Sequence, residues 1–211
     1  MILLLDTTTD YLGIGLWDNN KLHTKILKAN TQNNKKIVSI IDKFVCDLGF
    51  EVCDLQAIGL INGPGGFTGI RTGITIANTL AYSLKIPIYS TDSLSAQVPV
   101  KTNRSVIQKE ITSIISSAKE EVYYARFKGK ILMSSIQIVP VKILNKELEE
   151  KYFIVGQIRD EQKNKISVKY KKATPKDRMK TLLQMIIDKK IISQKQARPL
   201  YIKKPNITIK K

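Results

Sequence analysis

Residues 57–71 of the chain read AIGLINGPGGFTGIR. The apolar run at 57–61 predicts a buried strand, and the glycine-rich residues 62–69 predict a turn. A helix is expected from residue 69 to residue 84. A strand, a glycine-rich turn and a helix, in this order, form the layout that can hold a phosphate on free backbone N–H groups.

The glycine-rich turn matches neither of two familiar phosphate-binding motifs. A P-loop requires Gly-Lys-Ser/Thr at the start of the helix, where this chain has Gly69-Ile70-Arg71. The dinucleotide-binding pattern G-x-G-x-x-G also fails, because Thr68 stands where its third glycine is required. Thr68 is instead expected to be the N-cap of the helix. Two interpretations stay open for the turn, a phosphate contact and a tight structural turn.

Three strands are expected before this unit, at residues 1–5, 11–17 and 21–28, joined by short polar turns. An amphipathic helix at 33–48 follows them, and another strand is expected at 86–89. The predicted fold class is therefore α/β, with a mixed sheet in which three antiparallel strands are followed by parallel β-α-β units.

The second half of the chain gives weaker signals. Strands are expected at 121–127, 136–141 and 152–155, and a short helix at 146–151. Pro175 is expected to open a helix that ends near Lys189. The residues from Ala197 to the end are expected to be extended.

Charge and glycine content both divide the chain near residue 100. Residues 1–100 contain eight basic and eight acidic residues, so the formal net charge of +17 lies entirely after them. Nine of the eleven glycines lie at or before Gly73. We therefore expect an N-terminal domain at 1–100 and a smaller basic domain at 101–211, whose tail, 195–211, returns to the first domain.

The basic second half suggests an acidic partner, above all nucleic acid. The alternative is that its many lysines only solvate the surface. Other classes are excluded by composition. No apolar run approaches the roughly 18 residues of a membrane span, and the N-terminus lacks the pattern of a signal peptide. Two cysteines and one histidine supply neither a disulfide framework nor paired metal ligands. We expect a cytoplasmic protein with no membrane contact and no metal site.

The helix expected at 69–84 has one face that is short of charge. Threonine is a poor helix former, and an exposed helix normally carries lysine and glutamate. Depletion of charge is typical of the core of a protein interface, so this face favours a partner contact over a plain solvent-exposed surface. The residues of this face are Thr72, Thr75, Asn78, Thr79, Tyr82 and Ser83.

Two segments together resemble a known family. The run Asp6-Thr7-Thr8-Thr9 closes the first expected strand, and Gly-Pro-Gly-Gly-Phe-Thr-Gly-Ile-Arg occupies 63–71. Both resemble the TsaB (YeaZ) family, bacterial partner subunits in making threonylcarbamoyladenosine on tRNA, once classed as glycoprotease-like. The resemblance is dense over residues 1–97 and patchy beyond. It implies an actin-like ATPase (ribonuclease H-like) fold with two lobes around a cleft.

The resemblance further implies a subunit that performs no catalysis itself. It would bind and activate the catalytic TsaD subunit, which carries the metal and the transfer chemistry, and TsaE, an ATPase, would join the complex. The chain alone would form a homodimer, and its basic half could contact tRNA. No cofactor is required, and ATP or ADP is expected only at a partner interface.

The alternative is a free-standing nucleotide-binding protein, actin-like or sugar-kinase-like. Such a protein needs further glycine loops in its second lobe, where this chain has only Gly129 and Gly156.

The resemblance places the partner contact on the first two helices, at 33–48 and 69–84. The candidate contact residues are Ile37, Val38, Ile41, Thr72, Thr75, Ile76, Thr79 and Tyr82. The residues of the first lobe that could contact a phosphate are Asp6, Thr7, Thr8, Gly63, Gly65, Gly66, Thr68 and Arg71.

The chain departs from the family pattern at three places. Gly66 replaces a usual serine, Asn33-Asn34-Lys35 replaces a His-Ser pair, and Ser116-Ser117-Ala118 replaces Asp-Ala-Arg. The last change removes a carboxylate from the side of the cleft. These departures leave the geometry of partner binding open.

Overall fold

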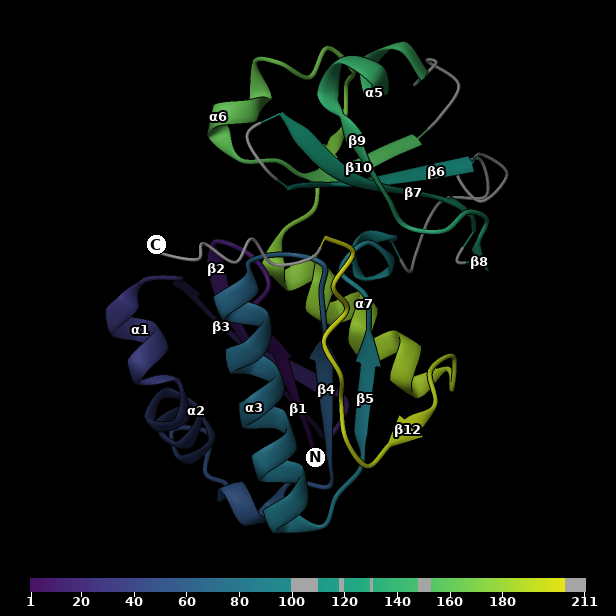
Figure 1. Cartoon of the computed structure of the whole chain (residues 1–211). Coiled ribbons are helices and arrows are strands. Elements are labelled where there is room, and N and C mark those ends of the chain that lie inside the picture. The colour runs from purple at the N-terminus through teal and green to yellow at the C-terminus, as the bar shows by residue number, and fades with distance from the viewer. Residues whose placement is uncertain (100–109, 118–119, 130, 148–152, 204–211) are drawn as a thin grey trace, which may run out of the picture.

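The computed structural model describes residues 1–99, 110–117, 120–129, 131–147 and 153–203. Within these residues, two mixed β-sheets form two lobes, one below the other in Figure 1. No helix in the same part of the chain is both long enough and apolar enough to cross a membrane.

The first sheet has the strand order β12-β5-β4-β1-β2-β3. Strands β1, β2 and β3 pair antiparallel, whereas β4 and β5 continue the sheet in parallel from β1. This confirms the predicted mixed sheet. The strands are β1 (Ile2–Asp6), β2 (Tyr11–Asp18), β3 (Lys21–Lys28), β4 (Ala57–Ile61), β5 (Ile88–Thr91) and β12 (Ser193–Gln194).

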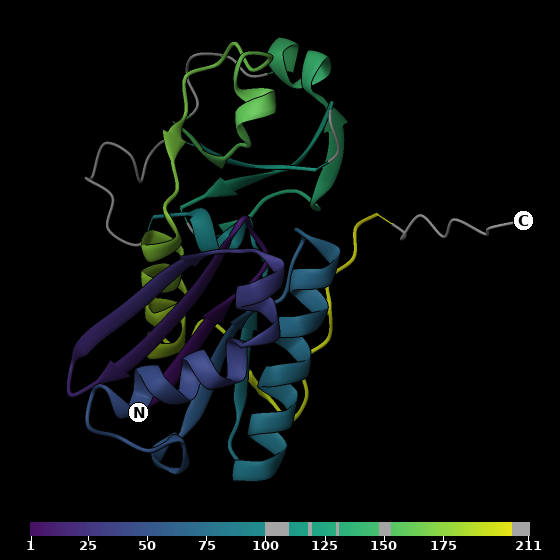
Figure 2. The same ribbon diagram turned by 90° about the vertical axis from the view of Figure 1, so that its left-hand side faces the viewer.

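Helices cover both faces of the first sheet (Figure 2). On one face, Leu3 and Leu5 of β1 pack in the cluster that includes the buried side chains of α2 and α3. On the other face, Leu4 packs with the apolar residues of α7. Burial on both faces explains why β1 is a continuous apolar run rather than an alternating one. The helices are α1 (Thr31–Lys35), α2 (Ile37–Cys46), α3 (Phe67–Leu84) and α7 (Pro175–Ile187).

The second sheet repeats the pairing pattern of the first. Its order is β11-β10-β6-β7-β8, with β9 also paired to β7. Strand β7 pairs antiparallel with β6, β8 and β9, and β10 and β11 continue in parallel from β6. The elements are β6 (Glu110–Ser116), β7 (Glu121–Lys128), β8 (Ile131–Leu132), β9 (Gln137–Pro140), β10 (Phe153–Gln157) and β11 (Lys171–Lys172), with α5 (Val141–Glu147) and α6 (Asp160–Lys163).

Two helix predictions for the first half need correction. The helix expected at 33–48 is divided, because α1 ends at Lys35 and α2 begins at Ile37. The side chain of Asn30 caps the start of α1. Periodicity could not predict this start, because α1 has no apolar stripe. The N-cap of α3 is Gly66 rather than Thr68, which lies in the first turn of the helix.

In the second half, the expected strands near β7, β9 and β10 are confirmed, as is Pro175 at the start of α7. Strand β6 was not predicted, because its buried polar residues, Thr112 and Ser113, hide any apolar alternation. The short helix expected at 146–151 overlaps the end of α5, which begins earlier, at Val141. The rest of that expected helix lies in residues 148–151, outside the described part.

The C-terminal part of the chain returns to the first sheet. Helix α7 lies against β1, β2 and β4, and β12 pairs with β5. Beyond β12, Ala197 exchanges two hydrogen bonds with the side chain of Asn78 in α3. The expected domain boundary at residue 100 and the tail after residue 203 lie outside the described residues, so the division into domains stays a prediction.

The packing of α7 on the first sheet predicts a contrast between two substitutions. Leu182→Ala removes a fully buried side chain, and we expect it to lower the free energy of unfolding by about 2–5 kcal/mol, since it leaves a cavity. Ile187→Ala on the same helix changes a side chain that is 46% exposed and should cost less than about 1 kcal/mol. Urea denaturation followed by circular dichroism measures both. Equal losses would show that α7 does not pack as described.

Candidate functional site

The glycine-rich turn packs directly on the turn between β1 and β2. A Cβ at Gly65 would lie 2.2 Å from the carbonyl oxygen of Thr8, and one at Gly69 would lie 2.0 Å from that of Thr7. The backbone N–H of Gly66 donates to the same Thr8 oxygen at 2.9 Å. Only glycine allows two backbones to approach this closely.

The C-terminal segment covers the turn from the other side. The N–H of Leu200 donates to the carbonyl of Asn62, and the ring of Tyr201 stacks on Phe67 with centroids 4.9 Å apart. The guanidinium of Arg71 lies 3.9 Å from the centre of the Phe67 ring and donates through Nε to the Tyr201 hydroxyl. These contacts make the glycine-rich turn a tight packing element between the β1–β2 turn and the C-terminal segment, and a phosphate contact at this turn stays a prediction.

A buried ion pair lies beside the turn. Asp6, at the end of β1, is 1% exposed, and Arg178, in α7, is fully buried. Nε of Arg178 donates to Oδ2 of Asp6 at 2.7 Å, and another guanidinium nitrogen donates to the Thr8 hydroxyl at 2.8 Å. The carboxylate also accepts hydrogen bonds from the N–H and hydroxyl of Thr8, and the carbonyl of Ser93 accepts one from Arg178.

This network determines whether the Asp6 carboxylate is free to bind a ligand. Both carboxylate oxygens are engaged by Arg178 and Thr8, so the carboxylate is not free to bind a metal or a phosphate-bound cation. Sequence reasoning selected Asp6 and Thr8 but missed Arg178. No local signal identifies it, because its partner is 172 positions away in the chain.

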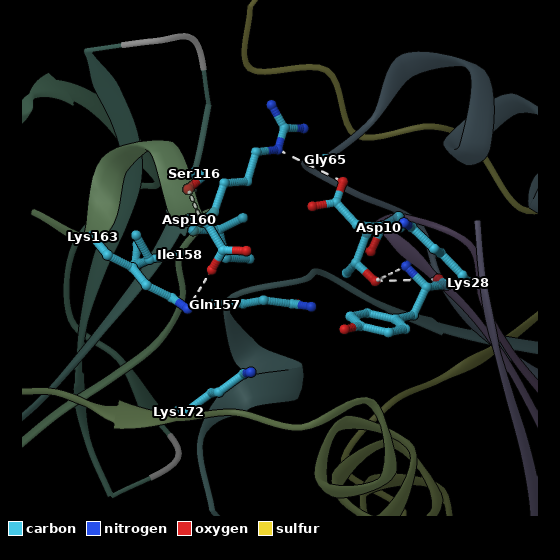
Figure 3. Close-up of a pocket in the computed structure, with 14 residues that line it drawn as sticks. Asp10, Lys28, Gly65, Ser116, Gln157, Ile158, Asp160, Lys163 and Lys172 are labelled. Carbon is cyan, nitrogen blue, oxygen red and sulfur yellow. Dashed lines mark hydrogen bonds and ion pairs between the residues drawn. The ribbon is translucent and has the colours of Figure 1, made fainter. Parts of the chain in front are cut away.

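A cavity of about 280 Å³ lies between the lobes, next to this network, and we call it the cleft cavity (Figure 3). The β1–β2 turn and Gly65 line it from the first lobe, and Ser116, Gln157 and the region of α6 line it from the second. Its charged residues are Asp10, Lys28, Arg159, Asp160, Lys163 and Lys172.

Cations outnumber anions in the cleft cavity. Arg159 forms an ion pair with Asp10 across the two lobes, with Nε 3.7 Å from Oδ1. Lys163 pairs with Asp160, and this hydrogen bond lowers the pKa of the carboxyl and raises the pKa of the ammonium group, so both are charged at neutral pH. Lys28 and Lys172 have no ion pair with the described residues. The cavity therefore suits a small anion.

The second lobe offers this cavity no glycine loop. Gly129 has a φ of 60° and lies in the turn between β7 and β8. Gly156 lies in β10, where a Cβ would be 2.6 Å from the side chain of Ile114, so it serves the packing of the sheet. Neither residue lines the cleft cavity. Among the described residues, no three His, Cys, Asp or Glu side chains are grouped closely enough to hold a metal ion.

The candidate partner residues fall into three groups, which are exposed, half-buried and buried. Thr75, Thr79 and Tyr82 are exposed on α3, with Tyr82 at 87%, and Val38 is exposed on α2 at 59%. Thr72 and Ile76 are half-buried. Ile37 and Ile41 are each only 2% exposed, because the i, i+4 apolar stripe of α2 faces the sheet. Their proposed contact with a partner is corrected accordingly.

Substitution by alanine should affect the free energy of unfolding differently at the two central glycines of the turn. Gly65→Ala forces a Cβ onto the Thr8 carbonyl and should lower the free energy of unfolding by about 1–3 kcal/mol. Gly66→Ala meets no atom nearer than 3.8 Å, at an ordinary φ of −64°, and should be neutral or slightly stabilising. Thermal denaturation compares the two variants. A stable Gly65→Ala variant would contradict the close packing.

Because Asp6 and Arg178 form a buried ion pair, their substitutions should have non-additive effects on the free energy of unfolding. Arg178→Met leaves the Asp6 carboxylate buried without its counter-ion, and we expect a loss of about 3–5 kcal/mol in the free energy of unfolding. Asp6→Asn combined with Arg178→Met removes both charges and should recover part of that loss. Urea denaturation of wild type, both single variants and the double variant forms the complete cycle. Strict additivity would rule out the coupling.

Comparison with known proteins indicates the family to which this chain belongs. A family model described as "TsaD: tRNA N6-adenosine threonylcarbamoyltransferase" matches residues 27–151, more than half of the chain. The TsaB protein of Buchnera aphidicola subsp. Schizaphis graminum is 28% identical over 178 residues, which cover 81% of this chain and 84% of that relative. TsaB of Escherichia coli K12 is 24% identical over 127 residues, 60% of this chain and 54% of the relative. Both relatives are named tRNA threonylcarbamoyladenosine biosynthesis proteins.

Solved structures agree in fold. YeaZ from Pseudomonas aeruginosa matches with a TM-score of 0.74 and 17% identity, covering 95% of this chain and 99% of that one. A second structure, described as similar to peptidase YeaZ from the same organism, has a TM-score of 0.76 over 96% of this chain and 99% of that one. The predicted actin-like, ribonuclease H-like fold with two lobes is confirmed. The matched family model, the sequence relatives and the shared fold converge, and the chain belongs to the glycoprotease-like family of that model and, within it, to the TsaB (YeaZ) family.

Proposed function

We propose that this chain acts in tRNA threonylcarbamoyladenosine biosynthesis as a non-catalytic subunit, which binds and activates a TsaD-type catalytic partner. Its relatives carry the name of that pathway. The partner would contact the exposed residues of α3 and α2. Binding would act by population shift, in which the partner's competent conformation is favoured by the energy of docking.

The observation that carries this proposal is the part of the exposed face of α3 that is formed by Thr75, Thr79, Tyr82 and Ser83, none of which is charged. Tyr82 is 87% exposed, and tyrosine is one of the residues that are enriched among those contributing most to binding at protein interfaces. Thr79 and Thr75 extend the same face from Tyr82 by about one and two turns respectively, and Val38 adds an exposed apolar side chain on α2. Uncharged side chains and an exposed aromatic residue are typical of the core of a protein interface.

Three further proposals concern other partners. A homodimer would use the same face, so homodimer and heterodimer would compete. A TsaE-type ATPase would join the heterodimer, with ATP or ADP bound only at a partner interface. The positive charge after residue 100 would add a salt-sensitive contact with tRNA phosphates.

The competing proposal is a free-standing nucleotide-binding protein of the actin-like or sugar-kinase-like type. The inter-lobe position of the cleft cavity favours it, since ligands of two-lobed folds bind there. Three observations weigh against ATP hydrolysis. The glycine-rich turn is packed between two segments, the Asp6 carboxylate is held by Arg178, and neither glycine of the second half lines the cavity.

Co-purification with the TsaD-type protein of the same source tests the main proposal. We expect the tagged wild-type chain to retain that protein. Thr75→Arg combined with Thr79→Glu places two charges on the exposed face of α3 and should weaken the complex by roughly tenfold or more. Both positions are exposed, so the variant should fold.

The matched control places the same two side chains elsewhere. Ser135→Arg combined with Gln137→Glu alters exposed positions beside and within β9, far from α3 in the chain. This variant should bind like wild type. Failure of the folded wild type to bind the partner would refute the proposed role, and equal loss in both variants would remove the assignment to α3.

A further inference from the structure

Helix α3 carries a single charged side chain, that of Arg71, in its sequence FTGIRTGITIANTLAYSL. Four exposed residues follow one another along this helix at spacings of four, four and three positions, which places them in one stripe. They are Arg71, Thr75, Thr79 and Tyr82, and we call them the α3 stripe. Arg71 is thus the charged end of the otherwise uncharged face that the proposed partner would contact.

Two aromatic rings hold the Arg71 guanidinium in place. Its central carbon lies 3.9 Å from the centre of the Phe67 ring, and its Nε donates to the hydroxyl of Tyr201 at 3.1 Å. Tyr201 is itself fixed, because it stacks on Phe67 and packs against the core of the first lobe, and the preceding N–H donates to the carbonyl of Asn62. The C-terminal segment therefore sets the orientation of the guanidinium.

These contacts leave most donors of the guanidinium open. A guanidinium has five N–H groups, of which the Tyr201 hydroxyl accepts one. Its two terminal nitrogens form no hydrogen bond or ion pair with residues that the structure describes. They form a planar fork that matches the two oxygens of a carboxylate. Because the orientation of the fork is already fixed, binding costs less conformational entropy.

The surroundings of Arg71 favour a protein carboxylate over a nucleic-acid phosphate. Proteins bind an RNA backbone with several cations, whereas α3 offers only this one and residues 1–100 have no net charge. Arginine and tyrosine are both enriched at protein interfaces, and they stand at the two ends of the α3 stripe.

We propose that Arg71 binds a carboxylate of the TsaD-type partner, and that Tyr201 is a positioning residue that holds the guanidinium for this contact. This inference rests on the proposed function, since it names the chemistry by which the same face recognises its partner. The uncharged part of the α3 stripe supplies contact area, and Arg71 fixes the position of the partner along it. The C-terminal segment contributes to recognition through Arg71.

Titration calorimetry of the full chain with the TsaD-type protein of the same source, at about 50 mM and about 300 mM NaCl, tests the contact. Arg71→Gln removes the charge and the fork, and should weaken binding roughly tenfold or more at low salt and reduce its dependence on salt. Arg71→Lys keeps the charge but loses the fork, so it should also weaken binding while the dependence on salt remains.

Tyr201→Phe tests the positioning role, because it removes only the hydroxyl and keeps a ring to stack on Phe67. We expect binding to weaken roughly threefold, with no further loss when the substitution is combined with Arg71→Gln. A loss that adds in full to that of Arg71→Gln would show that Tyr201 acts independently, and would overturn its positioning role.

The matched control removes one positive charge elsewhere. Lys180 is exposed on α7, which covers the opposite face of the first sheet from α3 (Figure 2). Lys180→Gln should bind the partner like wild type, with the same dependence on salt. A loss equal to that of Arg71→Gln would mean that only the total charge of the chain matters, and would overturn the proposed contact.

The remaining outcomes separate this inference from the proposed function, once circular dichroism has shown that each variant is folded. If wild type does not bind the partner, both fail. If wild type binds and Thr75→Arg combined with Thr79→Glu weakens the complex, but Arg71→Gln binds like wild type, only the carboxylate contact is overturned. A loss with Arg71→Gln that requires added tRNA would assign Arg71 to a phosphate and overturn the contact as well.

Discussion

The ion pair between Asp6 and Arg178 joins three parts of the chain at one buried point. Asp6 ends β1, Arg178 comes from α7, and the carbonyl of Ser93, which accepts from Arg178, follows β5. A charged pair without solvent is stable only when its remaining hydrogen-bonding groups are satisfied, and here the hydroxyl and N–H of Thr8 contribute. The position of the β1–β2 turn depends on this network.

The glycine-rich turn depends on the β1–β2 turn in the same way. Gly65 and Gly69 lie against the carbonyls of Thr8 and Thr7, so the first turn of α3 is placed by a backbone that Asp6 and Arg178 hold. The C-terminal segment then covers the glycine-rich turn through Tyr201. The glycine-rich turn has the strand–turn–helix layout of a phosphate-binding loop. In this structure it packs tightly between the β1–β2 turn and the C-terminal segment.

The exposed face of α3 and the cleft cavity lie on different parts of this framework. The face of α3 with Tyr82 is on the first lobe, whereas the cleft cavity lies between the lobes. The two can therefore be altered by separate substitutions. Family membership and the exposed, uncharged side chains of Thr75, Thr79 and Tyr82 support docking at α3.

The sequence by itself determined the mixed sheet, the glycine-rich turn with its helix, the uncharged face of α3 and the family. These follow from local periodicity and from a dense motif, which require no distant contact. Only the tertiary structure decided the burial of Ile37 and Ile41, the strand β6 and the Arg178 partner of Asp6. Each results from residues far apart in the chain that meet in the core, and no local pattern records which residues will meet.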